Sequence, residues 1–505
     1  MGKLVPFQPP PGVFKNGTPY QAKGRWSDCN LVRWKDGRLQ PLGGWEEVIG
    51  STVAGVGRAM ITWRDYTGAR WLAIGTNSNL YIFTSLSGTS SDITPVATTN
   101  PAEAALLAGN VDAEVGIGFG TGDFGGFVTI ATVTGPDISF TASGSVITST
   151  STVFTDATTA PEGPSPFAVN DEIEISGSVT ANNKTYPLSH RVVSVSANQM
   201  TVGPTNGSAI YGSNTLTTAS AGASVTIKRT RRFGNENAAT SSLVLDASSW
   251  IFDLWGENLI GMSTADGRIF EWDPTTTGAT SVKAVVIAGA PINNSAILVS
   301  KQRHLFAFGA GGNKRKIQWS DAESNTTWGA TAVNQAGSFE IDSSGEILAG
   351  KTVGDRILVW TSTDLHAVDF VNMPYIYGRK KIGDACGAIS NRSMIAVGDR
   401  AFWMSYGGFF QYQGTVQPLK CDVQDHIFKD INRVQDSKIY ASMNPEFFEV
   451  TWWYASSTSD EILKYVTYNY AEGWWSIGEL CRTAFAAGSP GVYENPIGIS
   501  DDGSV

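Results

Sequence analysis

The sequence predicts an all-β protein: a β-propeller into which a small β-barrel or sandwich domain is inserted. Composition is the first observation, because Gly 55 and Trp 16 with only 16% charged residues favour short strands and tight turns over exposed helices. The second is a strand–turn–strand unit that recurs every several tens of residues. The third is a gap in the tryptophans, which all lie up to Trp71 or from Trp250 onward.

Each recurring unit consists of an apolar strand, a turn rich in Gly, Asn or Asp, and a second strand. One hairpin cannot bury its apolar face, whereas blades that pack face to face around an axis can. A set of separate sandwiches is the alternative architecture, but irregular spacing fits a propeller with decorated loops better. The units fall at residues 70–83, 258–272, 355–368, 401–412 and 447–468, and a last one begins at 497–503.

The chain is expected to divide into five segments. These are an extended N-terminal segment for intermolecular contacts (1–50), the first propeller hairpins (51–110), a Gly-rich linker (111–136), the inserted β domain (137–232) and the remainder of the propeller (233–505). The last residues, 503–505, fall within a turn and a second strand. That strand is either very short or completed by another segment or another subunit.

The inserted domain is predicted from short alternating runs that lack tryptophan. In the clearest run, Ile173 and Ile175 face one side, and Glu172, Glu174 and Ser176 face the other. Further strands are expected at 138–140, 145–148, 191–195 and 200–202, the last two joined by a tight turn.

Charge and hydropathy exclude several classes of protein. The net charge of −10 argues against a general DNA-binding protein, because phosphate affinity needs clustered Lys and Arg. No apolar run approaches the length of a membrane-spanning helix, and the first residues have no apolar signal-peptide core, so we expect no membrane anchor.

No candidate for catalysis, cofactor binding or metal binding has the context that such chemistry needs, and we expect no enzyme. The four cysteines and four histidines are too scattered for a disulfide framework or a zinc site, so reduced thiols and structural histidines are expected. They are Cys29, Cys386, Cys421 and Cys481, and His190, His304, His366 and His426.

Three motifs have structural interpretations. The glycine run 116–126 is not followed by a helical pattern, which a dinucleotide site would require, so a linker is expected. Residues 320–328 resemble a loosened Asp-box, a turn motif between blade strands, in which Trp328 would pack between blades. Adjacent acids such as Asp501 and Asp502 are typical of solvated turns and not of converging glycosidase carboxylates.

The short basic groups 228–232, 314–316 and 379–381 could contact phosphates or an acidic neighbour. On an acidic chain without a wider basic face, contacts with a partner protein or solvated hairpin ends are the better interpretation.

The N-terminal segment carries the most informative pattern. It opens with Pro9-Pro10-Pro11-Gly12-Val13 and continues through 24–26 (Gly-Arg-Trp), 30–33 (Asn-Leu-Val-Arg) and 43–45 (Gly-Gly-Trp). In these stretches the chain resembles the phage stabilisation, or tail nozzle (tail hub), proteins of short-tailed bacteriophages. The resemblance continues at 243–246, 250, 255–259, 317–321 and 327–328. It covers most of 5–110 and 233–505 and leaves out the insert.

The resemblance implies a structural virion protein of the phage tail, assembled in the host cytoplasm as a homohexameric ring. Such a ring belongs to the head–tail connector complex. It closes the portal–adaptor channel, retains the packaged DNA and conducts it during ejection. The implied partners are the adaptor or connector ring, tail fibre or spike proteins, and double-stranded DNA that passes without sequence-specific binding. No catalytic residue transfers, because the shared motifs are structural.

An acidic chain suits a channel that DNA must pass without adhering. We therefore expect acidic or neutral residues on the inner surface of the ring, with Asp364, Asp501 and Asp502 as candidates. The competing interpretation is a propeller enzyme or glycan-binding protein, glycosidase-like or lectin-like, whose aromatic side chains stack on sugars.

Overall fold

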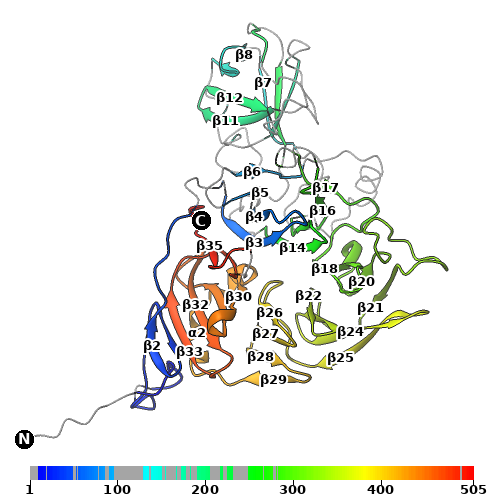
Figure 1. The fold of residues 1–505 in the computed structure, drawn as a ribbon. Helices are drawn as coiled ribbons and strands as arrows, with labels where there is room; N and C mark the ends of the chain where they lie inside the picture. Colours follow the sequence, from blue (N-terminus) through cyan, green and yellow to red (C-terminus); the bar gives the residue numbers. More distant parts are fainter. Residues whose placement is uncertain are drawn as a thin grey trace, which may run out of the picture.

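The chain forms a β-propeller with one inserted β domain, seen in a computed structural model (Figure 1). The structure describes residues 9–18, 20–48, 53, 55–77, 79–85, 90–95, 129–135, 138–150, 154, 167, 172–177, 182, 190–204, 216–219, 225–230, 248–265, 267–276, 280, 282–488 and 492–505. Within them, six four-stranded antiparallel sheets and one two-stranded sheet follow one another as blades I to VII. The predicted fold class is confirmed, and the alternative of separate sandwiches is wrong.

The blades follow the order of the chain, and their strands are as follows. Blade I contains β3 (Gly57–Arg64), β4 (Arg70–Thr76), β5 (Leu80–Phe83) and β6 (Ser91–Asp92); blade II contains β14 (Trp250–Trp255), β15 (Asn258–Ser263), β16 (Ile269–Trp272) and β17 (Val285–Val286); blade III contains β18 (Ala296–Val299), β19 (Leu305–Phe308), β20 (Lys316–Trp319) and β21 (Gly337–Glu340); blade IV contains β22 (Ile347–Val353), β23 (Arg356–Thr361), β24 (Leu365–Asn372) and β25 (Ile376–Gly383). Blade V contains β26 (Met394–Val397), β27 (Arg400–Ser405), β28 (Gly408–Tyr412) and β29 (Val416–Leu419); blade VI contains β30 (Tyr440–Asn444), β31 (Glu449–Ala455), β32 (Ile462–Asn469) and β33 (Trp475–Glu479); blade VII contains β34 (Ala484–Ala486) and β35 (Ile497–Ile499). Helical segments in the described residues are α2 (Gln424–Asp430) and the single turns η5 (Ala310–Gly312), η6 (Arg433–Lys438) and η7 (Pro445–Phe447).

The first strand of each blade lies nearest the axis. Strands β3, β14, β18, β22, β26, β30 and β34 contact one another in turn, and β34 returns to β3. The last residues contact the segment that precedes β3, because Val48 N donates to Val505 O at 3.0 Å and Val53 N donates to Gly503 O at 3.3 Å. Residues 503–505 form no strand in the structure.

The predicted hairpins are the middle strands of the blades, namely β4–β5, β15–β16, β23–β24, β27–β28 and β31–β32. These strands are buried on both faces between neighbouring blades, so their apolar character is the strongest in the sequence. One boundary differs, because residue 447 ends the turn η7 and β31 begins only at Glu449.

The inserted domain lies between β6 and β14 and shares no described strand with the blades. Its strands are β7 (Thr129–Gly135), β8 (Ile138–Thr141), β9 (Val146–Ser149), β10 (Glu172–Ser176), β11 (His190–Ser196), β12 (Gln199–Pro204) and β13 (Val225–Thr230), paired in the order β7-β13-β10-β11-β12-β9-β8. Ile173 and Ile175, expected on one face, are both buried in its core. Figure 1 shows this domain outside the propeller, near the outer strands of blade I.

The expected linker at 111–136 needs a correction at its end. Strand β7 occupies Thr129–Gly135 and pairs with β13, because a run rich in β-branched residues favours a strand over a linker. The glycine run 116–126 lies outside the described residues.

A strap, residues 9–48, packs along the outer edge of blade VI. Val13 is buried there and its N–H donates to Trp475 O at 2.9 Å, while Arg25 pairs with Asp422 at 2.9 Å. The strap also contains the hairpin of β1 (Val32–Lys35) and β2 (Arg38–Pro41). The Pro-rich start is therefore a component of the folded propeller and not a free arm.

Removing an indole between blades is expected to destabilise the whole propeller. Trp452 is fully buried, and its Nε1 donates to Ser393 O, which precedes blade V, at 2.9 Å. Trp452→Ala should lower the free energy of unfolding by about 3–5 kcal/mol, measured by urea denaturation. The control Tyr66→Ala, at a side chain that is 82% exposed, should cost within about 0.5 kcal/mol. Equal losses of stability in the two variants would contradict a role of Trp452 in holding blades V and VI together.

The strap is expected to be anchored in a pH-dependent way by Arg33 and Glu449, whose charged atoms are 3.1 Å apart. Burial, opposed by Arg33, raises the pKa of Glu449 from 4.5 to about 7, so this carboxyl contributes less stability as the pH rises from 4.5 through 7. Arg33→Ala should cost about 3–5 kcal/mol at pH 8.5, where an unpaired buried carboxylate remains, and clearly less at pH 5, where the carboxyl is protonated.

Thermal melts at both pH values, with hydrogen exchange of the strap, measure this difference. Lys301→Ala is the matched control, because it breaks the exposed ion pair with Asp355 and should cost about 0–1 kcal/mol at either pH. A loss for Arg33→Ala that is independent of pH would show that Glu449 does not control the anchor.

Candidate functional site

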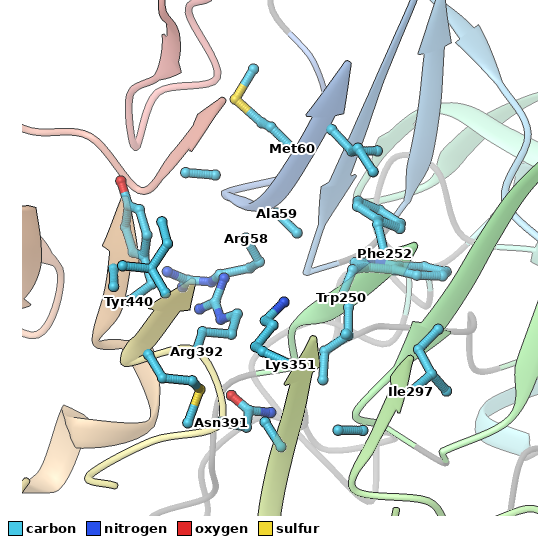
Figure 2. Close-up of a pocket in the computed structure, with 18 of the residues that line it drawn as sticks. Arg58, Ala59, Met60, Trp250, Phe252, Ile297, Lys351, Asn391, Arg392 and Tyr440 are labelled. Carbon is cyan, nitrogen blue, oxygen red and sulfur yellow. The ribbon is translucent and has the colours of Figure 1, made fainter. Parts of the chain in front are cut away.

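A cavity of about 350 Å³ lies at the propeller axis (Figure 2). Each of the seven innermost strands contributes side chains to its wall, so the cavity belongs to the propeller as a whole. Three basic side chains point into the same part of it in Figure 2: Arg58 from β3, Lys351 from β22, and Arg392 from the segment before β26.

Arg58 is almost completely buried and is held by a carboxylate. Its Nη1 and Nη2 donate to the two oxygens of Glu461 at 2.8 and 2.9 Å, which is the bidentate geometry that guanidinium groups favour. Lys438 Nζ lies 3.4 Å from the same carboxylate. Burial alone would raise the pKa of Glu461, but the hydrogen bonds and charge of Arg58 and the charge of Lys438 lower it below its ordinary value. Glu461 is therefore ionised and already fully engaged.

The positive charge of Lys351 is less well compensated than that of Arg58. Burial lowers the pKa of its ammonium, and the charge of Asp253 opposes that effect only in part. The Asp253 carboxylate accepts hydrogen bonds from the N–H groups of Leu254 at 2.8 Å and Val299 at 2.7 Å. Its pKa is nevertheless raised, because burial outweighs these bonds. Both members of this pair therefore pay a desolvation cost at the axis.

The wall of the cavity offers groups for binding and none for hydrolysis. Among its lining residues there is no carboxylate, histidine, serine or cysteine. Glycoside hydrolysis needs two carboxyl groups, and nucleophilic catalysis needs a hydroxyl or thiol beside a base. In the described part of the chain, no cluster of His, Cys, Asp and Glu side chains could hold a metal ion.

The aromatic side chains are mostly interior. Twelve of the 16 tryptophans are buried, and only Trp45 is exposed. Sugar-binding sites of the lectin type stack an accessible aromatic face on the sugar, and buried indoles cannot do this. The abundance of tryptophan is thus explained by packing between blades.

Of the 16 exposed large apolar side chains in the described part of the chain, eight lie in two segments, and the other eight are spread over the blades and the insert. The strap carries Tyr20, Leu31, Leu39, Trp45 and Val48. The hairpin tip, residues 371–375 between β24 and β25, carries Val371, Met373 and Tyr375. Figure 1 shows the strap and this hairpin projecting from different sides of the propeller.

The Asp-box-like segment 320–328 is a turn between β20 and β21, as predicted. Asp321 Oδ1 accepts hydrogen bonds from the N–H groups of Ala322 and Gln335 at 2.9 and 2.7 Å. Trp328 is buried, and Asn325 Nδ2 reaches Glu271 of blade II at 2.9 Å. The motif therefore joins blades II and III and has no catalytic geometry.

The cysteines and histidines occupy separate structural positions. All four thiols are free, and burial raises the pKa of each one. His304 Nδ1 lies 2.8 Å from Ser320 O, and His366 Nε2 lies 3.1 Å from Asp364. His190 is buried in the insert and His426 is half-buried beside the strap.

The expectation that Asp364 lines a channel is wrong. Asp364 is buried, accepts hydrogen bonds from Ser343 and Thr361, and pairs with Lys381 at 3.1 Å, so it cannot face a passage. Asp501 and Asp502 are exposed in the last turn, as expected of solvated acids.

Two of the basic groups are engaged within the chain. Lys314 lies 3.5 Å from Glu346, and the guanidinium of Arg379 lies over the Phe339 ring. Residues 228–230 belong to β13, while 231–232 lie outside the described residues.

The three cations at the axis could not be recognised as a site from the sequence alone. Their signal is a lone basic residue within an otherwise apolar or small-residue strand, at 57–61 and 349–353. Such a residue ordinarily faces solvent, and only the closed ring of strands brings the three together.

In the part of the chain that the structure describes, no helix is long and apolar enough to cross a membrane.

No family model matches the sequence, and no curated protein matches it. Among solved structures, the chain is similar to Kluyvelomyces marxianus Hsv2, with 9% identity and a TM-score of 0.26 over 45% of this chain and 59% of that one. It is also similar to a chain of an S. cerevisiae Dbp5 complex with Nup159 and Gle1, with 12% identity and a TM-score of 0.28 over 47% and 59%. A third is BBS1N in complex with ARL6DN, with 8% identity and a TM-score of 0.27 over 90% and 91%. The chain thus spans about three fifths of the first two structures. Similarities this low carry no argument about function, and the propeller assignment rests on the order and pairing of its own strands.

Proposed function

We propose that this chain is a structural protein of a short-tailed phage virion, a tail nozzle or hub subunit that assembles into a ring, with six copies as the family resemblance implies. In this role the ring docks on the adaptor, closes the portal–adaptor channel, retains packaged DNA and conducts it during ejection. The sequence resemblance suggests this role. The observation that carries it is that half of the exposed large apolar side chains in the described residues lie on the strap and the hairpin tip.

A closed ring requires two different contact surfaces on each subunit. In a cyclic assembly of more than two subunits, each subunit presents one surface to its neighbour on one side and a different surface to its neighbour on the other. The strap and the hairpin tip are two such surfaces and project from different sides of the propeller (Figure 1). We propose that the strap of one subunit receives the hairpin tip of the next.

The hairpin tip is well suited to insert into a neighbour. Tyr375 is 79% exposed, and Val371 and Met373 are about half exposed, although all three are large apolar side chains. Aromatic residues and methionine are enriched in the cores of protein interfaces, where they bury large areas on association. The tip is also rigid, because it continues the paired strands β24 and β25.

The charge of the chain is compatible with a DNA passage. The net charge is −10, and described basic groups such as Lys314 and Lys381 pair with acids of the same chain. The surplus of acidic side chains disfavours the accumulation of phosphates, so a duplex could pass without adhering. Tail fibres or spikes and the adaptor ring would bind the outer surfaces of such a ring.

A glycan-binding or hydrolytic propeller has less support. The axial cavity lacks the carboxylates of a glycosidase, and only one tryptophan is exposed for stacking on a sugar. That tryptophan, Trp45, is itself covered in part by the side chains of Arg482 and Phe485.

Charged substitutions on the two surfaces should abolish rings without unfolding the subunit. Tyr375→Glu and Leu39→Glu each place a charge in an interface that must be desolvated, so rings should be replaced by monomers in negative-stain microscopy and light scattering. Melting midpoints of the monomer should not change. Val285→Glu, which alters an exposed apolar residue of blade II, is the matched control and should still form rings.

Rings that persist in both variants would place the subunit contact elsewhere. A wild-type protein that remains monomeric at high concentration and binds glycans would instead support the competing function.

A further inference from the structure

We propose that the axial cavity is a binding site for a small oxyanion of the phosphate class, held by Arg58, Lys351 and Arg392. The three side chains come from blades I and IV and from the segment that enters blade V, and they point into one part of the cavity (Figure 2). This site is independent of the proposed role in a virion, because it lies within a single chain.

The first support is an imbalance of charge around the cavity. Three cations line it, Arg58, Arg392 and Lys351, and Lys438 shares the Glu461 carboxylate with Arg58. Among the described residues, the carboxylates that act on these cations are Glu461 and Asp253. Glu461 is shared by Arg58 and Lys438, and the oxygens of Asp253 accept backbone N–H groups. Positive charge thus exceeds negative charge in a poorly solvated region, where charges are normally compensated.

The second support is the environment of Arg392. Its Nε is buried and has no hydrogen-bond partner in the described part of the chain. Its Nη2 reaches only Lys438 O, at a long 3.5 Å, and the guanidinium lies 5.7 Å from the centre of the Tyr440 ring. Burial, followed by the like charge of Arg58, lowers the pKa of Arg392 to about 10. An anion between the two guanidinium groups would replace this repulsion with attraction.

The third support is Lys351, the cation on the opposite wall. In the residues that the structure describes, its Nζ makes no hydrogen bond, and the charge that acts on it is that of Asp253. Figure 2 shows its ammonium group at the cavity wall. A lysine that is free to donate three hydrogen bonds is well suited to an anionic oxygen.

The size and chemistry of the cavity define the ligand class. A volume of about 350 Å³ accommodates a phosphate-sized ion together with several waters, each of which occupies roughly 30 Å³ in the liquid. Guanidinium groups match the paired oxygens of phosphate, and Lys adds a point charge. No carboxylate lines the wall to repel the ion, and the Asn391 amide offers a further donor.

Binding of inorganic phosphate to the purified full-length chain tests the proposal. Isothermal titration calorimetry should detect one phosphate per chain. The melting midpoint should also rise with phosphate concentration beyond the rise given by sodium chloride of equal ionic strength, because a ligand of the folded state stabilises it. Lys351→Met and Arg392→Met should each weaken binding by about tenfold or more, as expected for a lost charged hydrogen bond.

Lys301→Met is the matched control, because Lys301 is exposed and lies outside the cavity, and it should bind phosphate as the wild type does. Without phosphate, Lys351→Met should keep the wild-type circular dichroism spectrum and a cooperative melt, which shows that the variant is folded.

The proposal is overturned if the wild type binds no phosphate, if chloride stabilises it equally, or if both cavity variants bind as well as the control. Because the measurement is made on single chains, such a result would not contradict the proposed assembly into rings. Loss of rings in the surface variants, in turn, says nothing about the cavity.

Discussion

Two of the interfaces between blades depend on indole N–H groups that donate to carbonyl oxygens of the neighbouring blade. Two such bonds, Trp63 to Glu257 and Trp250 to Thr76, join blades I and II, and two more, Trp452 to Ser393 and Trp475 to Lys420, join blades V and VI; each is 2.9 Å long. A buried indole contributes a large apolar surface, but its N–H must find a partner. Because the partner lies on the next blade, the bond fixes which blades are neighbours and how they are oriented.

The packing between blades also explains some of the glycines. A Cβ at Gly75 would lie 2.4 Å from the Trp250 ring, and a Cβ at Gly350 would lie 2.2 Å from the Phe308 ring. Neither position needs unusual backbone angles, so the absence of a side chain serves close packing of a ring from the adjacent blade. The sequence suggests turns for most glycines, and this second use becomes visible only when the partner blade is known.

Features that depend on neighbouring residues could be predicted from the sequence, whereas features that depend on contacts between distant segments could not. The middle strands of blades are continuous apolar runs with Gly, Asn or Asp turns, so hairpins such as β23–β24 are local signals. Blade III was missed because β18 and β19 are joined through Arg303, which adopts a positive φ of 62° without the usual Gly or Asn. The cations of the axial cavity come from residues hundreds of positions apart. Their meeting depends on closure of the ring, which no local pattern encodes.

Rigid seams also explain how like charges persist at the axis. In a flexible protein, Arg58 and Arg392 would move apart or turn to solvent, because an uncompensated buried charge is costly. Here β3 and β26 are each held between the first strands of two neighbouring blades, and Arg58 is fixed further by Glu461. An anion or water can therefore lower the energy of Arg392 and Lys351 without any rearrangement of the blades. The strap and the hairpin tip share no residue with the cavity wall. The same scaffold can therefore support assembly at its rim and ion binding at its axis, and selection can change either one without disturbing the other.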